Sequence, residues 1–97
     1  MRVRLVSKVY SEIESAMDYY LREAGAEFAT EFYEEFKRCR GIIAERPQSY
    51  PIVRDDIRRI NFRRFPYRIL YQVVDEGYVK VLVVKHDSRD PDFDLDR

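Results

Sequence analysis

Four cationic side chains in the second half of the chain are of types that can act on a phosphate or a proton: Arg59, Arg68, His86 and Arg89. Histidine changes charge near neutral pH and can transfer a proton, whereas arginine can hold the negative charge of a phosphate. As a catalyst His86 needs a partner, and no arrangement of that kind is evident in the sequence. A histidine at the end of a central strand is more often a hydrogen-bonded structural residue, which makes catalysis by His86 the less favoured interpretation.

Two of these arginines belong to residues 58–74, where alternation predicts two strands that meet at a corner at Phe65-Pro66. One face of this hairpin is expected to be aromatic and branched. The opposite face is expected to gather Arg59, Asn61, Arg63, Arg68 and Gln72. The alternative interpretation of this face is the solvent-exposed side of a half-buried sheet, without a function of its own. We favour a functional basic face, because arginine is costly to order and strands usually present Thr, Ser or Lys to solvent.

Composition predicts one domain over residues 1–97, with 45% hydrophobic residues and a net charge of zero. The charges are unevenly distributed. Residues 1–56 carry nine basic and eleven acidic side chains, residues 57–89 carry eight and three, and residues 90–97 carry one and four. The hairpin region is therefore the positive pole. Residues 90–97 form an acidic tail, either disordered or laid over the basic face.

Several classes of protein are excluded or disfavoured. Cys39 is the only cysteine, so an internal disulfide or a thiolate metal cluster cannot form, and we expect no metal and no cofactor. The first residues have no apolar run of signal-peptide length, and nowhere do about 18 apolar residues follow one another. These observations predict a cytoplasmic protein with no membrane partner.

Helical periodicity dominates the first half of the chain. Val3 and Leu5 alternate with Arg2 and Arg4, which predicts a short strand that stops at Ser7. Ser7 is the expected N-cap of a helix from about residue 8 to residue 24, and Gly25 is its expected end. Ser11 and Glu14 form a competing capping-box pair. A second apolar stripe runs to Pro47 and comprises Phe28, Ala29, Phe32, Phe36, Cys39 and Ile43. Two such helices predict an antiparallel hairpin that covers the aromatic face of the sheet.

The remaining elements complete an α+β order, β-α-α-β-β-β, with the helical hairpin packed on a small, mostly antiparallel sheet. Residues 47–56 contain two prolines and have no periodicity, so we expect an ordered loop. Residues 78–85 are nearly continuous in Val and Leu, which predicts a strand in the middle of the sheet, buried on both sides.

This order and two segments of the chain resemble the RelE/ParE superfamily of bacterial toxins, often described as plasmid stabilisation proteins. The segments are Arg58-Arg59 followed by Phe65-Pro66-Tyr67-Arg68-Ile69-Leu70-Tyr71, and Val84-Lys85-His86-Asp87-Ser88-Arg89-Asp90-Pro91. The resemblance implies a growth-inhibiting toxin of a type II toxin–antitoxin system, neutralised by a cognate antitoxin. It also leaves a homodimer or a toxin–antitoxin hetero-oligomer open.

The superfamily contains two chemistries. RelE-like members are ribosome-dependent endoribonucleases that cut messenger RNA, whereas ParE-like members poison DNA gyrase by contact. The resemblance places the RelE-type strand arginine at Arg68 and a second cation at Arg89. The two RelE-type lysines fall on Arg59 and Asn61, and the C-terminal tyrosine falls near Phe93. Because asparagine, arginine and phenylalanine are poor substitutes in proton transfer, the resemblance favours the ParE-like branch and a non-enzymatic toxin.

Three functions therefore remain: a ParE-like toxin that binds a protein target such as DNA gyrase, a RelE-like ribonuclease acting on the ribosome and its message, and a superfamily member without toxicity. For target or antitoxin binding, the sequence nominates the basic side chains and one tyrosine that is free to stack on a partner. These residues are Arg59, Asn61, Arg63, Arg68, Arg89 and Tyr50.

Overall fold

The structure is a computed structural model that describes residues 1–75 and 77–88. Its elements, in chain order, are β1 (Arg2–Leu5), α1 (Ser7–Ala24), α2 (Ala26–Glu45), β2 (Ile52–Arg54), β3 (Ile57–Asn61), β4 (Tyr67–Val74) and β5 (Tyr78–His86). The five strands form one sheet in the order β1-β5-β4-β3-β2. Strand β1 pairs with β5 in parallel, and all other neighbours are antiparallel.

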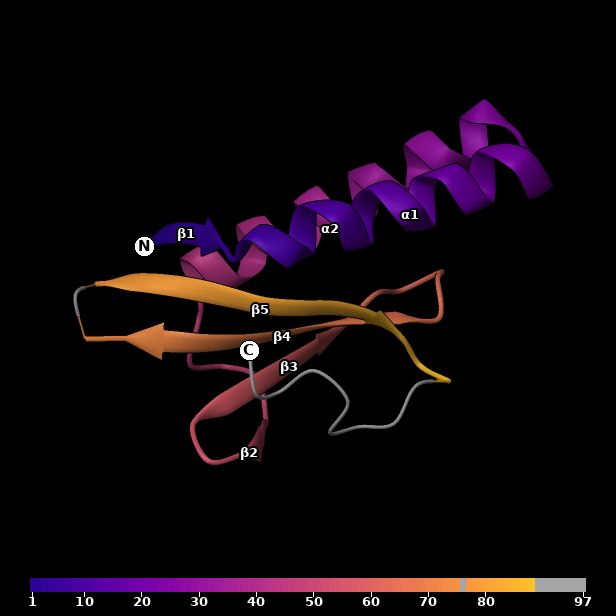
Figure 1. Cartoon of the computed structure of the whole chain (residues 1–97). Coiled ribbons are helices and arrows are strands. Elements are labelled where there is room, and N and C mark those ends of the chain that lie inside the picture. Colours follow the sequence, from indigo (N-terminus) through magenta and orange to yellow (C-terminus); the bar gives the residue numbers. More distant parts are fainter. Residues whose placement is uncertain (76, 89–97) are drawn as a thin grey trace.

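The two helices lie side by side on one face of the sheet (Figure 1). This arrangement confirms the predicted α+β class and the helical hairpin on a mostly antiparallel sheet. One part of the prediction is wrong: the stretch expected to be a loop contains β2, an edge strand paired with β3. All three residues of β2 are exposed, so neither side of this strand packs on the core. A strand of this kind needs no alternation of apolar and polar side chains, which is the pattern that identifies strands in a sequence.

The start of α1 also differs from expectation. Val6 occupies the N-cap position, without a capping side chain, and Ser7 is already helical. Val6 donates its backbone N–H to the Val81 carbonyl of β5 at 3.1 Å. This bond holds Val6 in an extended conformation immediately before the helix. The Ser11 hydroxyl bonds to the Lys8 carbonyl within the first turns. A helix can begin here without a serine cap, because the sheet already fixes the chain.

Gly25 ends α1 as predicted. Its φ of 98° lies in the region that favours glycine, and its N–H donates to the carbonyls of Tyr20 and Leu21. The chain reverses at this single residue, so α2 starts at Ala26 and the two helices become antiparallel neighbours.

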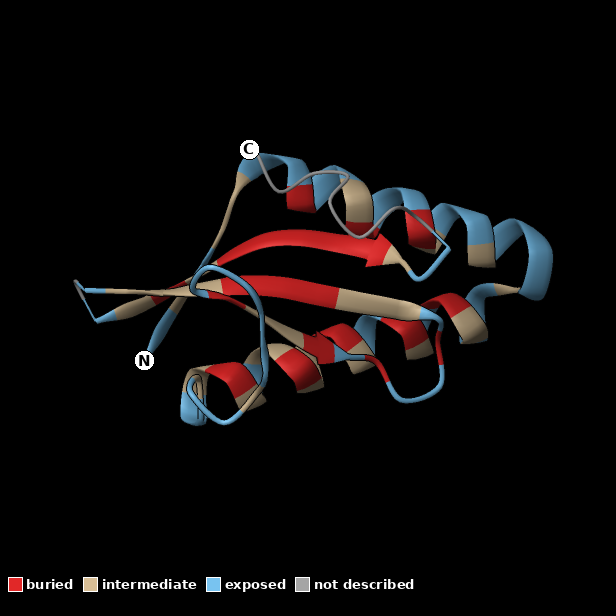
Figure 2. Cartoon of the chain, turned by 90° about the horizontal axis from the view of Figure 1, so that it is seen from below, coloured by how far each residue is buried: buried red, intermediate tan, exposed pale blue. Residues whose placement is uncertain are grey.

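The main core fills the space between the helices and the sheet (Figure 2). Four large side chains are at its centre: Phe32, Phe62, Ile69 and Tyr71 are between 0% and 6% exposed. Other aromatic rings surround Phe32, with centroid distances of 5.3 Å to Phe62 and 5.0 Å to Tyr67. Dense aromatic packing of this kind fixes the position of the hairpin on the sheet.

The sheet face turned away from the helices is called the outer face here. Strand registers place on it the residues that alternate with the main core, namely Arg2, Arg4, Ile57, Arg59, Asn61, Arg68, Leu70, Gln72, Lys80, Val83 and Lys85. A second buried cluster lies among them, formed by Ile57, Leu70, Leu82 and Val83. Strand β5 is therefore buried on both sides between β1 and β4, as its Val-rich sequence predicts.

Candidate functional site

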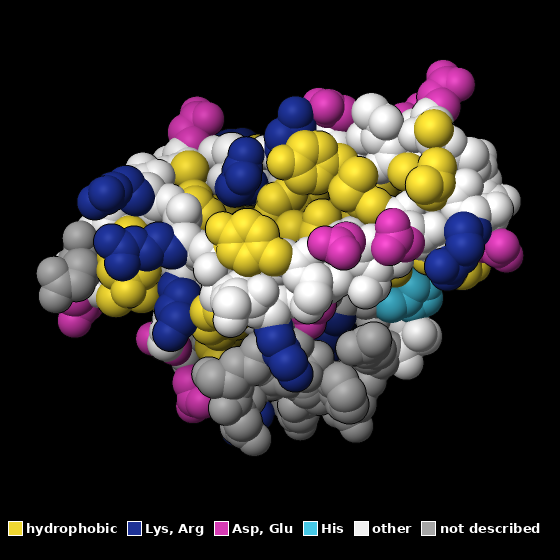
Figure 3. Space-filling view, turned by 45° about the horizontal axis from the view of Figure 1, so that its top comes forward, with side chains coloured by type: hydrophobic (Ala, Val, Ile, Leu, Met, Phe, Trp, Pro, Cys, Tyr) yellow, Lys and Arg dark blue, Asp and Glu magenta, His cyan; other side chains and the backbone are white. Residues whose placement is uncertain are grey.

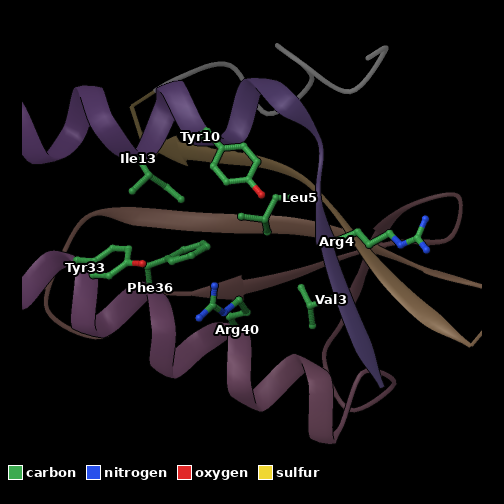
Figure 4. A pocket seen from close by; sticks show the side chains of 8 residues that line it. All are labelled: Val3, Arg4, Leu5, Tyr10, Ile13, Tyr33, Phe36 and Arg40. Atoms are coloured by element: carbon green, nitrogen blue, oxygen red, sulfur yellow. The ribbon is translucent and has the colours of Figure 1, made fainter.

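An open apolar groove lies between α1, α2 and β1, and it is called the helix groove here. It is lined by Val3, Arg4, Leu5, Tyr10, Ile13, Tyr33, Phe36 and Arg40, around a volume of about 480 Å³. Figure 3 shows the corresponding hydrophobic surface over the two helices, with Lys and Arg gathered mainly at its left. In Figure 4, side chains from all three elements face the same space, whereas Arg4 points away from it.

Exposed aromatic rings form the walls of the helix groove. The Tyr10 side chain is 62% exposed, which is unusual for a large ring beside an apolar floor. Tyr33 stacks on Phe36 at a centroid distance of 6.3 Å. Cations extend this wall, since Lys37 lies 5.1 Å from the Tyr33 ring centre and Arg40 lies 5.6 Å from that of Phe36. The groove suits an amphipathic segment that combines apolar anchors with carboxylates.

The outer face brings together four of the residues predicted to form a basic face. Asn61 pairs with Arg68 across β3 and β4, and Arg59 lies opposite Leu70. Several of these groups already have partners: Arg68 Nε bonds to Asp87 Oδ1 at 3.0 Å, and Gln72 Nε2 donates to both carboxylate oxygens of Asp56.

Further cations of the outer face come from the other two strands. Arg2 and Arg4 of β1 pair with Tyr78 and Lys80 of β5, and the Arg4 guanidinium lies 4.6 Å from the Tyr78 ring centre. The prediction of the basic face did not include them. The signal was present in the alternation of Arg2 and Arg4 with Val3, but the parallel pairing that joins β1 to the sheet is a long-range contact.

Arg63 does not share this face. Strand β3 ends at Asn61, so Arg63 lies in the corner before β4, and its backbone N–H donates to Glu35 on α2 at 2.7 Å. The register of a strand therefore does not extend to Arg63, and the alternation of the sequence overestimated the length of the strand by two residues.

Tyr50 is half-buried and packs against the main core. Its carbonyl accepts a 2.7 Å bond from Arg58 Nη1, which also donates to the Gln48 carbonyl at 3.2 Å. Arg58 thus holds the loop between α2 and β2 in place, a structural role that the sequence did not indicate. Arg89 and Phe93 lie outside the described residues.

The three candidate catalytic residues that the structure describes fall on opposite faces of the sheet. His86 pairs with Tyr67, and the two rings meet edge to face at 5.2 Å on the helix side. Arg59 and Arg68 project from the outer face. His86 Nδ1 also lies 2.9 Å from Ser88 Oγ and accepts the Ser88 backbone N–H at 3.0 Å. Nδ1 of His86 is therefore used in hydrogen bonds within this turn.

Burial changes the pKa of several groups in the core. Burial raises the pKa of the Cys39 thiol to about 12 and that of the Tyr71 hydroxyl to about 12. Burial, followed by the neighbouring Tyr67, also raises the pKa of Tyr20. These groups stay protonated at neutral pH, so they are structural in character.

Two further kinds of site were sought among the described residues. Within residues 1–75 and 77–88, no three His, Cys, Asp or Glu side chains come together as ligands for a metal ion. None of the described helices has the length and apolar character that crossing a bilayer requires.

Solved structures with the same fold come from toxin–antitoxin systems. The chromosomal ParDE system of P. aeruginosa gives a TM-score of 0.75 at 16% identity, covering 89% of this chain and 95% of that chain. The isolated E. coli RelE toxin gives 0.63 at 22% identity, covering 93% and 87%. The intact E. coli RelBE toxin–antitoxin complex gives 0.64 at 23% identity, covering 91% and 98%.

No curated protein matches the chain by sequence. A family model does match: residues 3–91 fit the ParE toxin of the type II toxin–antitoxin system, parDE. This match spans most of the chain and agrees with the resemblance found in its hairpin and last strand. The chain therefore belongs to the ParE toxin family of type II toxin–antitoxin systems.

Proposed function

We propose that this chain is a toxin that acts by binding a protein target and does not itself cleave RNA. The observation that carries the proposal is the separation of His86 from Arg59 and Arg68 by the thickness of the sheet. Cleavage of a phosphodiester needs a proton acceptor and charge-stabilising cations around one phosphate, within hydrogen-bond reach. Side chains on opposite faces cannot meet that requirement without refolding.

The residue types on the outer face support the same proposal. Arg59 and Asn61 adjoin Arg68, but arginine keeps its proton at physiological pH and an amide is not a base. These three side chains can bind an acidic partner but are not suited to remove a proton from a ribose hydroxyl. DNA gyrase is the first target to test, because the resemblance to ParE-like toxins implies it.

The target is tested with purified chain in two parallel assays. One measures inhibition of DNA supercoiling by gyrase, and the other measures cleavage of message on programmed ribosomes. We expect loss of supercoiling without cleavage. Cleavage without any effect on gyrase would overturn the proposal and favour a ribonuclease, whereas no effect in either assay would favour a member without toxicity.

We also propose that a cognate antitoxin neutralises the chain by covering the helix groove. The floor around Ile13 and Phe36 is apolar, Tyr10 is largely exposed, and cations lie beside Tyr33 and Phe36. An amphipathic helix with acidic residues at one end would bury these rings and pair with the cations.

The antitoxin proposal can be tested with the product of an adjacent short reading frame. Tyr10→Asp places a charge in the groove and should weaken binding at least tenfold in calorimetry. Tyr19→Asp is the matched control, because Tyr19 is 50% exposed on the same helix but does not line the groove. Equal losses in the two variants would contradict this location.

A further inference from the structure

The parallel pairing of β1 with β5 gathers three cations and one aromatic ring at the edge of the outer face. In the register of the two strands, Arg2 lies beside Tyr78 and Arg4 lies beside Lys80. The residues between them on both strands pack on the main core, so these four side chains share the opposite face. Arg2 and Arg4 are exposed, whereas Tyr78 and Lys80 are partly exposed. The four residues are called the β1–β5 patch here.

The cations of the β1–β5 patch have no ion-pair partner in the described part of the chain. Elsewhere on the outer face, Arg68 is already paired with a carboxylate. None of the ion pairs that the described residues form includes Arg2, Arg4 or Lys80. The adjoining turn carries the exposed Asp75, which takes part in none of these ion pairs either. These three cations therefore remain available to an anion from outside the molecule.

The patch consists of charge and one covered ring, and it offers little apolar surface. The Arg4 guanidinium lies 4.6 Å from the centre of the Tyr78 ring. Figure 4 shows Arg4 pointing away from the helix groove, so the apolar floor of the groove is not part of this surface. Protein interfaces bury an apolar or aromatic centre inside a polar rim. Nucleic acids instead bind to cations that contact phosphates and to planar groups on which bases stack, and the patch has both components.

We propose that the β1–β5 patch binds a single strand of nucleic acid, with its phosphates on the three cations and one base stacked on the Arg4–Tyr78 pair. Arg2 and Arg4 are about 7 Å apart along one strand, and Lys80 lies about 5 Å from Arg4 on the next strand. This spacing suits contact with about three phosphates of a chain that carries one charge per nucleotide. A single strand exposes its bases for stacking, whereas a duplex does not. Phosphates and base faces are common to DNA and RNA, so both are ligands.

This site is separate from the basic residues of the hairpin. Lys80 lies five residues before Lys85 on β5, which is about 17 Å along the strand, and Lys85 is the residue that pairs with Arg68. It is also separate from the helix groove, because successive side chains of β1 leave opposite faces of the sheet. Binding of a nucleic acid strand is therefore a further activity, independent of the protein target and of the antitoxin.

Fluorescence anisotropy of a labelled twelve-nucleotide oligothymidylate, titrated with the purified full chain, tests the proposal. Three phosphate contacts at about 0.7 each predict a slope of about 2 when log Kd is plotted against log salt. Binding should therefore weaken about 20-fold between 50 mM and 200 mM NaCl. A labelled oligouridylate of the same length should bind within about threefold of the oligothymidylate. Failure of either strand to bind at 50 mM NaCl would overturn the proposal.

A triple variant tests the location of the site. Arg2→Gln, Arg4→Gln and Lys80→Gln together should weaken binding at 50 mM NaCl at least tenfold and bring the salt slope close to zero. The control triple removes the same charge from three exposed positions of the helical layer, Lys8, Arg22 and Arg46. It should keep the slope of the natural chain, and far-UV circular dichroism verifies that both variants are folded. Equal losses in the two triple variants would contradict this location.

Two further measurements test the class of ligand. Tyr78→Ala should weaken binding roughly fivefold or more without a change in salt slope, whereas Tyr78→Phe should bind like the natural chain. Unlabelled oligothymidylate should displace the label at concentrations at least tenfold lower than an oligoaspartate peptide with the same number of charges. Equal displacement by the peptide would overturn the proposal and favour an acidic protein as the ligand. None of these measurements involves gyrase, ribosomes or an antitoxin, so their failure is distinguishable from failure of the proposed function.

Discussion

The Glu35 carboxylate on α2 accepts the backbone N–H of Arg63 at 2.7 Å, and this bond joins the helical layer to the corner between β3 and β4. The same carboxylate accepts two bonds from Arg38, each of 2.8 Å. The corner lies between the ends of β3 and β4, so this side-chain bond adds a link to the backbone bonds that Phe65 and Pro66 make there.

Glu35→Ala should lower the melting temperature by several degrees, because the Arg63 N–H and the Arg38 guanidinium both lose their acceptor. Thermal unfolding monitored by circular dichroism measures the effect. Glu34→Ala serves as the control, since Glu34 is exposed and pairs with Lys37 on the helix surface. A melting temperature as high in Glu35→Ala as in the control would show that the corner does not depend on this carboxylate.

The pH dependence of stability provides a second test of Glu35. The Arg38 hydrogen bonds, and to a lesser degree the Arg63 N–H, lower the pKa of Glu35 below its ordinary value of 4.5. A lowered folded-state pKa gives stability that is complete above pH 4.5 and is lost as the pH falls through the folded pKa. Glu35→Gln should therefore unfold with a shallower pH dependence below pH 4.5 than the natural chain, when denaturation by urea is compared between pH 3 and pH 6.

Tyr71→Phe should destabilise the fold by about 1–2 kcal/mol, because the buried hydroxyl donates to the Pro47 carbonyl at 2.7 Å and that acceptor would lose its partner. The raised pKa of Tyr71, about 12, has an alkaline consequence. The unfolded tyrosine ionises near pH 10 and the folded one near 12, so stability falls as the pH rises through this interval. The Phe variant should lose that component in urea denaturation at pH 9 and pH 11.

Cys39 should be unreactive in the native state. Burial raises the pKa of its thiol to about 12, and its side chain is fully inaccessible. Thiol–disulfide exchange needs a thiolate that the reagent can reach. We expect less than a tenth of one equivalent of labelling by an aromatic disulfide reagent at pH 8, and one full equivalent in 6 M guanidinium. Rapid labelling without denaturant would mean that α2 separates readily from the sheet.

Phe32→Ala should cost about 3–5 kcal/mol of unfolding free energy, since Phe32 is fully buried among the rings of Phe62, Phe65 and Tyr67. Chemical denaturation measures this loss directly. Phe28→Ala should cost less, because Phe28 is only partly buried at the margin of the core. A smaller loss at Phe32 than at Phe28 would contradict the packing of the hairpin on the sheet.

The basic side chains are tested together by replacing Arg59, Arg63 and Arg68 with Gln. If the outer face and its corner bind the cellular target, growth inhibition on induction should disappear while the melting temperature changes by only a few degrees. A control triple, Lys8→Gln, Arg22→Gln and Arg46→Gln, removes the same charge from exposed positions of the helical layer. Full toxicity of the first triple variant would show that these arginines have no role in binding the target.

Local periodicity in the sequence was sufficient to predict the helical hairpin, the strands around Ile60 and Ile69, and the buried last strand. These patterns are properties of neighbouring residues: apolar side chains at helical or alternating spacing must share a face wherever the chain goes. The single glycine between the two apolar stripes also predicted the reversal at Gly25. For the same reason, the alternation within the two strands correctly placed Arg59, Asn61 and Arg68 on one face of the sheet.

Only the tertiary structure decided which of these residues meet. Arg58 and Arg63 look like members of the same basic run, yet Arg58 holds the loop at Tyr50 and the Arg63 backbone is held by Glu35, 28 positions earlier in the chain. Strand β2 exists because β3 supplies a partner, and the helix groove exists because the parallel pairing of β1 with β5 brings Leu5 beside two helices. Such contacts depend on how distant segments pack, which no local pattern of side chains encodes.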